Sequence, residues 1–557
     1  MERSTRRRTL RSHGGSRRSG ASRARGLLMA SMEPQAIQYQ TWERAFLPTI
    51  AAADPFRESL LRVEITNPYG DVRWREGFWD GGVWRLRWMP LEEGPHHLRI
   101  ETTLPGLPAS LGVLVEAAAS PEPGFRHGLS TSGPVRVADD PTRFARHDGA
   151  PFFLACEEMY STPTRATDAE WAFYCAQRSR IGFTGVGLAT DVVRSFGARR
   201  VAEGEPPAFA PDLAYLARLD RRIATLNAHG LIAIPELFGL ATIDHPLNVR
   251  PGSDLDDVIS PLDAVRLGRY LDARWGASDV LWRMNLPGGA DEDAALVELT
   301  AEIGRSVFGV DPWCAPVTVD LGERELLHPL LQSEAWIGWI ASRTHGRWND
   351  ASLRWIHTEH AAAAKTGLPR PHVNVDPVVY GELWNAGDEE GARSARELVY
   401  ASVFAAPPAG AGFAMREVHD WVRRRLDSGD ETRGTRPTVS WLQAIEDQAA
   451  EEIGRIVTVL SKYRWADLSP APELLLEPSE TGIAVLASSD RSMIRVYVPR
   501  GGTFGLTEGV GSYSAYWISP RMGEADVALG EIPLDHPFTS PDERDWVLEL
   551  DKAESTF

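Results

Sequence analysis

Between residues 152 and 404 the chain carries eight short apolar runs, separated by longer stretches of helical pattern. The runs span residues 152–155, 185–188, 231–235, 280–285, 316–319, 335–341, 372–375 and 399–404, of which the sixth and eighth fit a helix equally well. Short apolar runs that alternate with helices are typical of βα units and a parallel sheet. A count of eight favours a closed barrel over an open sheet, so the expected fold class is α/β with a (β/α)₈ TIM barrel.

Patterns of β-strands flank this region on both sides. Residues 61–65 and 83–88 alternate apolar with polar side chains at the period of a half-buried strand, and the period returns at 482–486, 493–498 and 513–518. We therefore predict four segments. They are a disordered basic leader over 1–32, a β-sandwich over 38–118, the barrel over 130–470 and a second small β-sandwich over 473–553.

The charge balance disfavours nucleic acid as a partner. The net charge is −18, although residues 1–28 hold nine Arg and a single Glu, so the remainder is more acidic than the whole. Phosphate binding demands the opposite sign. The leader fits a polyanion-binding arm, an export signal or an untranslated segment before Met29 or Met32, but only residues 26–30 are apolar after the arginines, which argues against export.

The three cysteines, Cys156, Cys175 and Cys314, lack the paired spacing of a disulfide framework or a Cys-based zinc site. No run of about 18 apolar residues exists that would span a membrane. We therefore expect a cytoplasmic protein without membrane contact, metal or cofactor. A monomer and a homo-oligomer both stay open.

Asp376 is the first catalytic candidate, because it follows the apolar run 372–375 and is fixed by Pro377. Active sites of TIM barrels form at the C-terminal strand ends, and sugar cleavage needs two acids. Glu236 also ends an apolar run, where desolvation would favour the protonated form that a general acid needs. Glu157 ends the first run as a third candidate. The alternatives are a turn cap for Asp376 and a buried ion pair with an arginine for Glu236.

Further residues near the strand ends are candidates for binding a substrate. Aromatic side chains stack on the apolar faces of sugar rings, although each of them could instead belong to the core. His345 could bind a substrate hydroxyl or a loop carbonyl, and Glu382 could bind substrate or lie in a surface loop. The predicted contacts are Trp282, Asn285, His345, Tyr380, Glu382 and Trp421. His357 and His360 lack the spacing of a zinc protease, and we expect an exposed helix face there.

Motifs around the barrel region match a known domain order. Residues 133–137 with 148–153, Tyr463 to Pro470, Ala515 to Gly523 and Asp545 to Leu548 resemble bacterial glycoside hydrolases with an apiosidase-like (β/α)₈ domain. The resemblance implies an immunoglobulin-like domain before the barrel and a β-sandwich of the candidate collagen-binding type after it. It also implies hydrolysis of a glycosidic bond in a glycan fragment or glycoside by a pair of carboxylates.

The catalytic positions depart from that family. The family has an Asp about five residues past a Trp at the fourth strand, where Pro287 follows Trp282 here. At the seventh strand Asp376-Pro377 and Tyr380 stand in place of Glu-Pro and Tyr, and Glu157 replaces an Asp at the first strand. The alternative hypotheses are a barrel that binds carbohydrate without hydrolysing it and, more remotely, an assembly scaffold.

Overall fold

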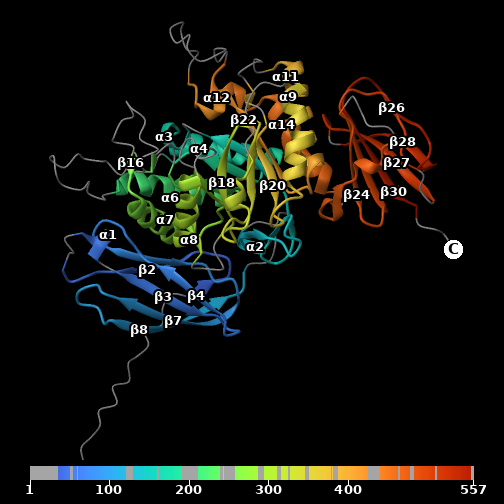
Figure 1. Cartoon of the computed structure of the whole chain (residues 1–557). Helices are drawn as coiled ribbons and strands as arrows, with labels where there is room; N and C mark the ends of the chain where they lie inside the picture. Colours follow the sequence, from blue (N-terminus) through green and yellow to red (C-terminus); the bar gives the residue numbers. More distant parts are fainter. Residues whose placement is uncertain are drawn as a thin grey trace, which may run out of the picture.

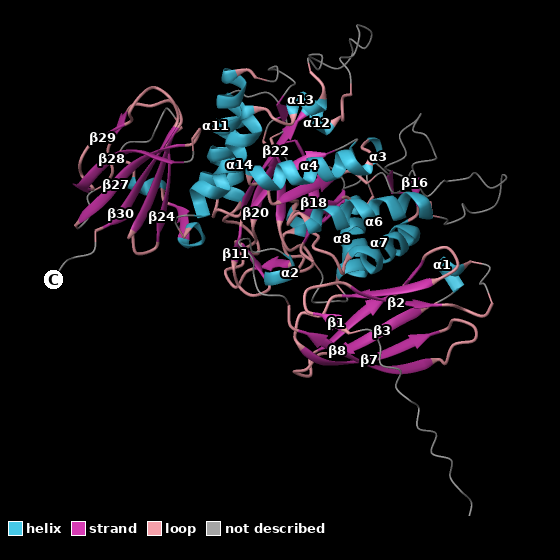
Figure 2. Ribbon diagram, turned by 180° about the vertical axis from the view of Figure 1, so that it is seen from behind, coloured by secondary structure: helices cyan, strands magenta, loops and turns pink. Residues whose placement is uncertain are grey.

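The structure is a computed structural model, and its parts follow one another in chain order (Figures 1 and 2). It describes residues 35–50, 54–58, 60–120, 129–159, 162–190, 211–238, 242–243, 258–285, 294–309, 315–323, 326–344, 350–377, 379–380, 387–423, 439–461, 464–476, 482–507, 511–522 and 524–553.

The N-terminal part consists of two β-sheets with an apolar core between them. Every second side chain of strand β3 is buried in this core: Leu61, Val63 and Ile65. Strand β6 alternates in the same way and buries Trp84, Leu86 and Trp88. The strands at 61–65 and 83–88 are therefore confirmed. In sheet order the strands are β1 (Ala36–Ile37), β8 (Ser110–Ala118), β7 (Gly94–Thr102), β3 (Leu61–Thr66) and β4 (Val72–Glu76), then β2 (Trp42–Phe46), β6 (Trp84–Trp88) and β5 (Phe78–Trp79).

The central part is built on parallel strands in two hydrogen-bonded groups. In order, the first holds β14 (Ile232–Pro235), β13 (Gly185–Leu188), β12 (Leu154–Met159), β22 (Gly410–Met415) and β21 (Val379–Tyr380). The second holds β17 (Trp282–Asn285), β18 (Val317–Glu323), β19 (Ile340–Arg343) and β20 (His372–Asp376).

The two groups also approach each other at two places. Between β14 and β17, the Leu281 amide donates to the carbonyl of Ala233 at 3.0 Å, and the Leu237 amide donates to the carbonyl of Arg283 at 2.9 Å. On the other side, a Cβ added to Gly412 would lie 1.7 Å from the carbonyl oxygen of Val375. Only glycine allows β22 to approach β20 this closely, and the whole arrangement is TIM-barrel-like.

Helices pack around the outside of these strands (Figures 1 and 2). Helix α4 shows how the sequence defines them: Thr167 and Glu170 form a capping box at its start, and Gly182 ends it at a φ of 111°. Around the strands lie α4 (Asp168–Ile181), α6 (Leu213–Ala228), α7 (Pro261–Trp275), α8 (Ala294–Phe308), α11 (Glu389–Ala405) and α14 (Gln448–Ser461).

The predicted strand at 399–404 is wrong, because these residues lie inside helix α11. Helix α11 is buried between β20 and the C-terminal sheet. Val399 and Tyr400 are therefore buried on sides of the helix where a surface helix would carry polar residues. Periodicity cannot separate such a run from a buried strand. The strand that pairs with β12 is instead β22, and its glycines interrupt the apolar run that would indicate a strand. The run at 335–341 is strand only from Ile340.

The C-terminal part is a β-sheet that packs beside α11 and α14 (Figure 1). β25 and β27 confirm the strands predicted at 493–498 and 513–518, and β24 begins two residues later than predicted. Tyr497 stacks on Tyr400 of α11 with ring centroids 4.9 Å apart. The order is β23 (Leu468–Pro470), β24 (Ala484–Ser488), β25 (Met493–Val498), β30 (Trp546–Lys552), β27 (Ser512–Ser519) and β28 (Glu524–Pro533), with β26 (Thr503–Phe504) and β29 (Phe538–Thr539) as a separate pair.

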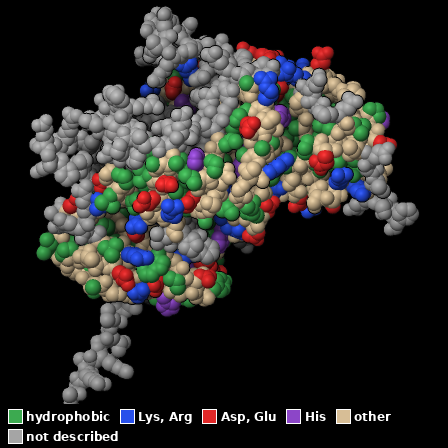
Figure 3. Space-filling model, in the orientation of Figure 1, with side chains coloured by type: hydrophobic (Ala, Val, Ile, Leu, Met, Phe, Trp, Pro, Cys, Tyr) green, Lys and Arg blue, Asp and Glu red, His purple; other side chains and the backbone are tan. Residues whose placement is uncertain are grey.

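On the face shown in Figure 3, acidic and basic side chains are interspersed over the described surface. No helix among the described residues is both long and apolar enough to cross a membrane.

Candidate active site

Alternation along the parallel strands determines which side chains face the barrel interior. Leu154 and Cys156 of β12 pack there with Ile232 and Ile234 of β14, and the same core cluster includes Leu281, Trp339, Ala341, Val373 and Val375. Side chains on a strand face the same way every second residue. One step further toward the C-terminal ends, this alternation places charged residues at the interior: Glu158, Glu236, Arg283 and Arg343.

These four residues and Asp376 form what we call the mouth cluster. Arg283 Nη1 lies 2.6 Å from Glu158 Oε2, and Arg283 Nη2 lies 2.5 Å from Glu236 Oε1. Arg343 Nη2 lies 3.7 Å from Glu158 Oε2, and Arg343 Nη1 lies 3.9 Å from Asp376 Oδ2. Three carboxylates and two guanidinium groups, carried by four strands and by the residue that follows β14, thus converge at the C-terminal ends of these strands.

The thiol of Cys156 lies below this cluster. Burial raises its pKa well above the usual value, and the nearby charge of Glu158 raises it further. Arg283, Asp376 and Arg343 also act on this thiol electrostatically. The thiol of Cys156 therefore interacts electrostatically with four of the five residues of the mouth cluster, which indicates that these residues lie close together.

Glu158 is the carboxylate of the mouth cluster that was not predicted from the sequence, and neither arginine of the cluster was predicted. It is 1% exposed, and its Oε1 has no hydrogen-bond partner among the described residues. A Cβ on Gly187 of β13 would lie 2.4 Å from that oxygen, so the glycine makes room for the carboxylate. Its position two residues after Cys156 was the available signal, because Leu154 and Cys156 already face inward.

Glu157 faces the opposite way, into the layer between β12 and α4. Its Oε2 accepts hydrogen bonds from Tyr174 Oη at 2.7 Å and Arg178 Nε at 2.6 Å, and its Oε1 accepts from Arg178 Nη2 at 2.9 Å. Both partners belong to α4, and both sides of the ion pair are fully buried. The structure thus leaves Glu157 outside the mouth cluster, since adjacent strand residues point to opposite faces.

Three predicted aromatic contacts lie in the core between strands and helices. Trp282 stacks on Trp275 of α7, and Tyr380 lies against Phe413 with its hydroxyl directed at the carbonyl of Asp388. Trp421 stacks on Trp441 with centroids 3.9 Å apart. All three are at most 2% exposed, so they present no ring face to a sugar.

The remaining predicted contacts are not placed by the structure. Asn285 is the last residue of β17, but its side chain is outside the described part. His345, Glu382 and the departure at Pro287 also lie outside the described residues. Glu236 is described, and it has the arginine partner that was the alternative to an acid role.

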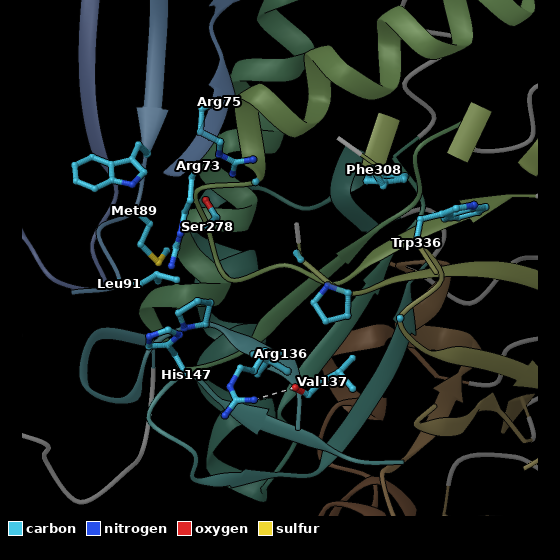
Figure 4. A pocket seen from close by; sticks show the side chains of 18 of the residues that line it. Arg73, Arg75, Met89, Leu91, Arg136, Val137, His147, Ser278, Phe308 and Trp336 are labelled. Carbon is cyan, nitrogen blue, oxygen red and sulfur yellow. Dashed lines mark hydrogen bonds between the residues drawn. The ribbon is translucent and has the colours of Figure 1, made fainter. Parts of the chain in front are cut away.

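A cavity of about 690 Å³ lies at the other end of the strands, between the N-terminal sheets and the barrel (Figure 4). Its lining includes Arg73, Arg75 and Arg136, which pair with Glu92, Asp272 and Asp139. Its aromatic residues, Trp88, Phe308 and Trp336, are at most 9% exposed. With paired charges and covered rings, its walls offer no free platform for a sugar.

Within the described ranges, no group of three or more His, Cys, Asp or Glu side chains could hold a metal ion.

Comparison with known families identifies the class of protein. Residues 139–467 match the model of the apiosidase-like catalytic domain, and residues 35–103 match a domain of unknown function, DUF5060. The protein is a glycoside hydrolase of TIM-barrel-like fold. Because the first match covers more than half of the chain, the chain belongs to the apiosidase-like catalytic domain family.

Solved structures are similar in fold. A candidate glycoside hydrolase from Bacteroides vulgatus ATCC 8482 shares 13% identity at a TM-score of 0.66, over 94% of this chain and 100% of that one. A glycoside hydrolase family 5 protein from the same organism shares 14% identity at a TM-score of 0.60, over 76% of this chain and 96% of that one. No curated protein matches the sequence significantly.

Proposed function

We propose that this glycoside hydrolase cleaves its substrate at the mouth cluster. Asp376 and one of the two carboxylates bound by Arg283 would form the catalytic pair. The supporting observation is the convergence of Glu158, Glu236 and Asp376 at the C-terminal strand ends, where TIM barrels carry their chemistry. The substrate is a glycan fragment or a glycoside, and the reaction needs no cofactor.

The reaction requires two carboxyl groups in different protonation states. One must be protonated, to give its proton to the departing sugar oxygen, and the other must be ionised, to act on the anomeric carbon directly or through water. The contact of Glu236 with a guanidinium favours its charged form, which counts against its role as general acid.

We also propose a closed (β/α)₈ barrel over 130–470, an immunoglobulin-like sandwich over 38–118 and a C-terminal β-sandwich over 473–553. Asn285, His345 and Glu382 remain proposed substrate contacts, because each follows or ends a barrel strand. A cytoplasmic location is supported by Cys156 and Cys175, two buried free thiols.

A screen of aryl glycosides and oligosaccharides between pH 4 and 9 tests this function, with Asp376→Asn as the matched inactive variant. Turnover by the wild-type protein and a loss of at least a hundredfold in Asp376→Asn are expected. A wild-type protein that turns over none of these substrates would contradict the proposal.

The second candidate is a barrel that binds carbohydrate without cleaving it. It is favoured by the arginine contacts, because each mouth carboxylate has a guanidinium within 4.0 Å. Calorimetry separates the two candidates: sugar binding without hydrolysis, unchanged in Asp376→Asn, supports this one.

A further inference from the structure

We infer that Glu158 is the ionised carboxylate of the catalytic pair, acting at the anomeric carbon, and that Glu236 positions Arg283. This inference rests on the proposed function and assigns the roles within the same site.

Glu158 contacts both arginines through one oxygen and buries the other one. Its Oε2 contacts both arginines of the cluster, at 2.6 Å and 3.7 Å. Its Oε1 is buried against Gly187 without a hydrogen-bond partner among the described residues. A buried carboxylate oxygen left unpaired is costly, and such exceptions concentrate where a group has a role beyond structure.

Both arginines of the mouth cluster contact Glu158 as salt-bridge partners of its Oε2. Because a guanidinium group is positively charged, these contacts suit a carboxylate that acts as nucleophile or base at the anomeric carbon. Glu236 shares Arg283 at 2.5 Å and balances the charge on the other side of that guanidinium.

Asp376 then takes the role of proton donor. Its Oδ2 lies 3.9 Å from Arg343 Nη1, a longer separation than the 2.6 Å between Glu158 and Arg283. Because Glu158 and Asp376 contact the same guanidinium, their oxygens lie within about 10 Å of each other, which includes the separations that glycosidases use.

In the retaining form of the reaction, an oxygen of Glu158 bonds to the anomeric carbon while the glycosidic C–O bond breaks, and Asp376 gives its proton to the departing oxygen. Water then attacks the same carbon, Asp376 takes a proton from it, and the ester bond to Glu158 breaks. In the inverting form, Glu158 takes a proton from a water whose oxygen bonds to the anomeric carbon, while the glycosidic C–O bond breaks and Asp376 gives its proton to the departing oxygen.

Glu158→Gln tests the inference, with Glu236→Gln as a control that removes the other charge from the same arginine. On an aryl glycoside that the wild-type protein cleaves, we expect kcat to fall at least a thousandfold in Glu158→Gln and about tenfold in Glu236→Gln. Thermal unfolding of each variant shows whether it is folded.

Chemical rescue provides a measurement that a structural role would not affect. In Glu158→Gly, sodium azide should restore turnover and yield a glycosyl azide, because a small anion replaces the missing carboxylate at the anomeric carbon. Equal losses in the two glutamine variants, or no rescue by azide in a folded glycine variant of a retaining enzyme, would overturn the assignment. An inactive wild-type protein would overturn the proposed function as well.

Discussion

Glu157 and Glu158 are neighbours in the chain but serve opposite sides of strand β12. Glu157 is held by Tyr174 and Arg178 of α4, whereas Glu158 meets Arg283 in the barrel interior. Their chemistry is the same, so only the direction of each side chain separates a structural carboxylate from a candidate catalytic one.

Glu157→Ala should destabilise the protein by about 3–5 kcal/mol, because it leaves the fully buried Arg178 without its carboxylate. Urea unfolding followed by tryptophan fluorescence measures the change. The turnover number per folded molecule should fall far less than in Glu158→Gln. A Glu157→Ala protein of wild-type stability would contradict this account of the ion pair.

His360 and His372 are a buried pair whose rings lie 6.1 Å apart. An exposed helix face was expected at His357 to His360, but His360 is buried in the π-helical turn Ile356–His360, where its Nδ1 lies 3.1 Å from Ser342 Oγ. Burial lowers the pKa of His360 to about 4 and that of His372 to about 3, where the charges of His360 and Arg370 add to the effect.

Both histidines should make the protein sensitive to acid. Their pKa values are below the unfolded value of about 6.5, so the unfolded chain binds more protons at intermediate pH. The stability that they confer is complete above pH 6.5 and is lost as the pH falls toward 4. The free energy of unfolding should fall by about 1.4 kcal/mol per pH unit for each histidine.

Urea unfolding between pH 7 and pH 5 measures this slope, which should be shallower in His372→Gln. His97→Gln, at an exposed position of β7, is the matched control and should leave it unchanged. A slope that is the same in all three proteins would rule out the buried pair as its source.

At the scale of secondary structure, glycines on β13 and β22 decide how closely the barrel strands and their side chains approach. Gly187 leaves room for the carboxylate of Glu158, and Gly412 allows β22 to lie against the backbone of β20. Glycines weaken the apolar pattern by which a strand is predicted. For this reason the sequence predicts a strand at 399–404 and none at β22.

Gly412→Ala should separate β22 from β20 and cost about 3 kcal/mol or more, because the added methyl group meets the carbonyl of Val375, which cannot rotate away. Gly112→Ala is the control, since a Cβ there has no neighbour within 4 Å and β8 is a strand as well. Thermal unfolding should show a large loss for the first variant and almost none for the second.

At the scale of the whole molecule, buried ion pairs join the three parts of the chain. Arg274 of α7 is held by Asp220 of α6 and by Asp80 beside the N-terminal sheets. On the other side, Arg396 of α11 binds Asp545, which precedes β30. These contacts connect elements far apart in sequence, and we infer that the flanking parts are fixed to the barrel.

Asp220→Ala should loosen the N-terminal part. It removes the partner of Arg274 Nε at 2.8 Å and of Trp275 Nε1 at 2.7 Å, and we expect a loss of about 2 kcal/mol because Arg274 keeps Asp80. Limited proteolysis of the N-terminal part should become faster. Glu101→Ala, which breaks the exposed pair with Arg99, should change neither property.

Much of the architecture could be predicted from the sequence. Alternation in β3 and β6, and the apolar runs at β13, β14 and β20, depend on local contacts with a single core face, so the residues themselves carry the signal. The acids at strand ends, Asp376 and Glu236, followed from the same reasoning.

The pairing of charges could be decided only by the tertiary structure. Arg283 is 125 residues from Glu158 and 47 from Glu236, and no local pattern indicates that one guanidinium would bind both. Trp282, Tyr380 and Trp421 were equally ambiguous, because an aromatic residue near a strand end can face a substrate or the helix layer. The sequence by itself determined which strands form and where acids end them, because each strand buries one face according to its own alternation. Only the folded barrel decided which acids meet, since ion pairing depends on distances between strands that are remote in the chain.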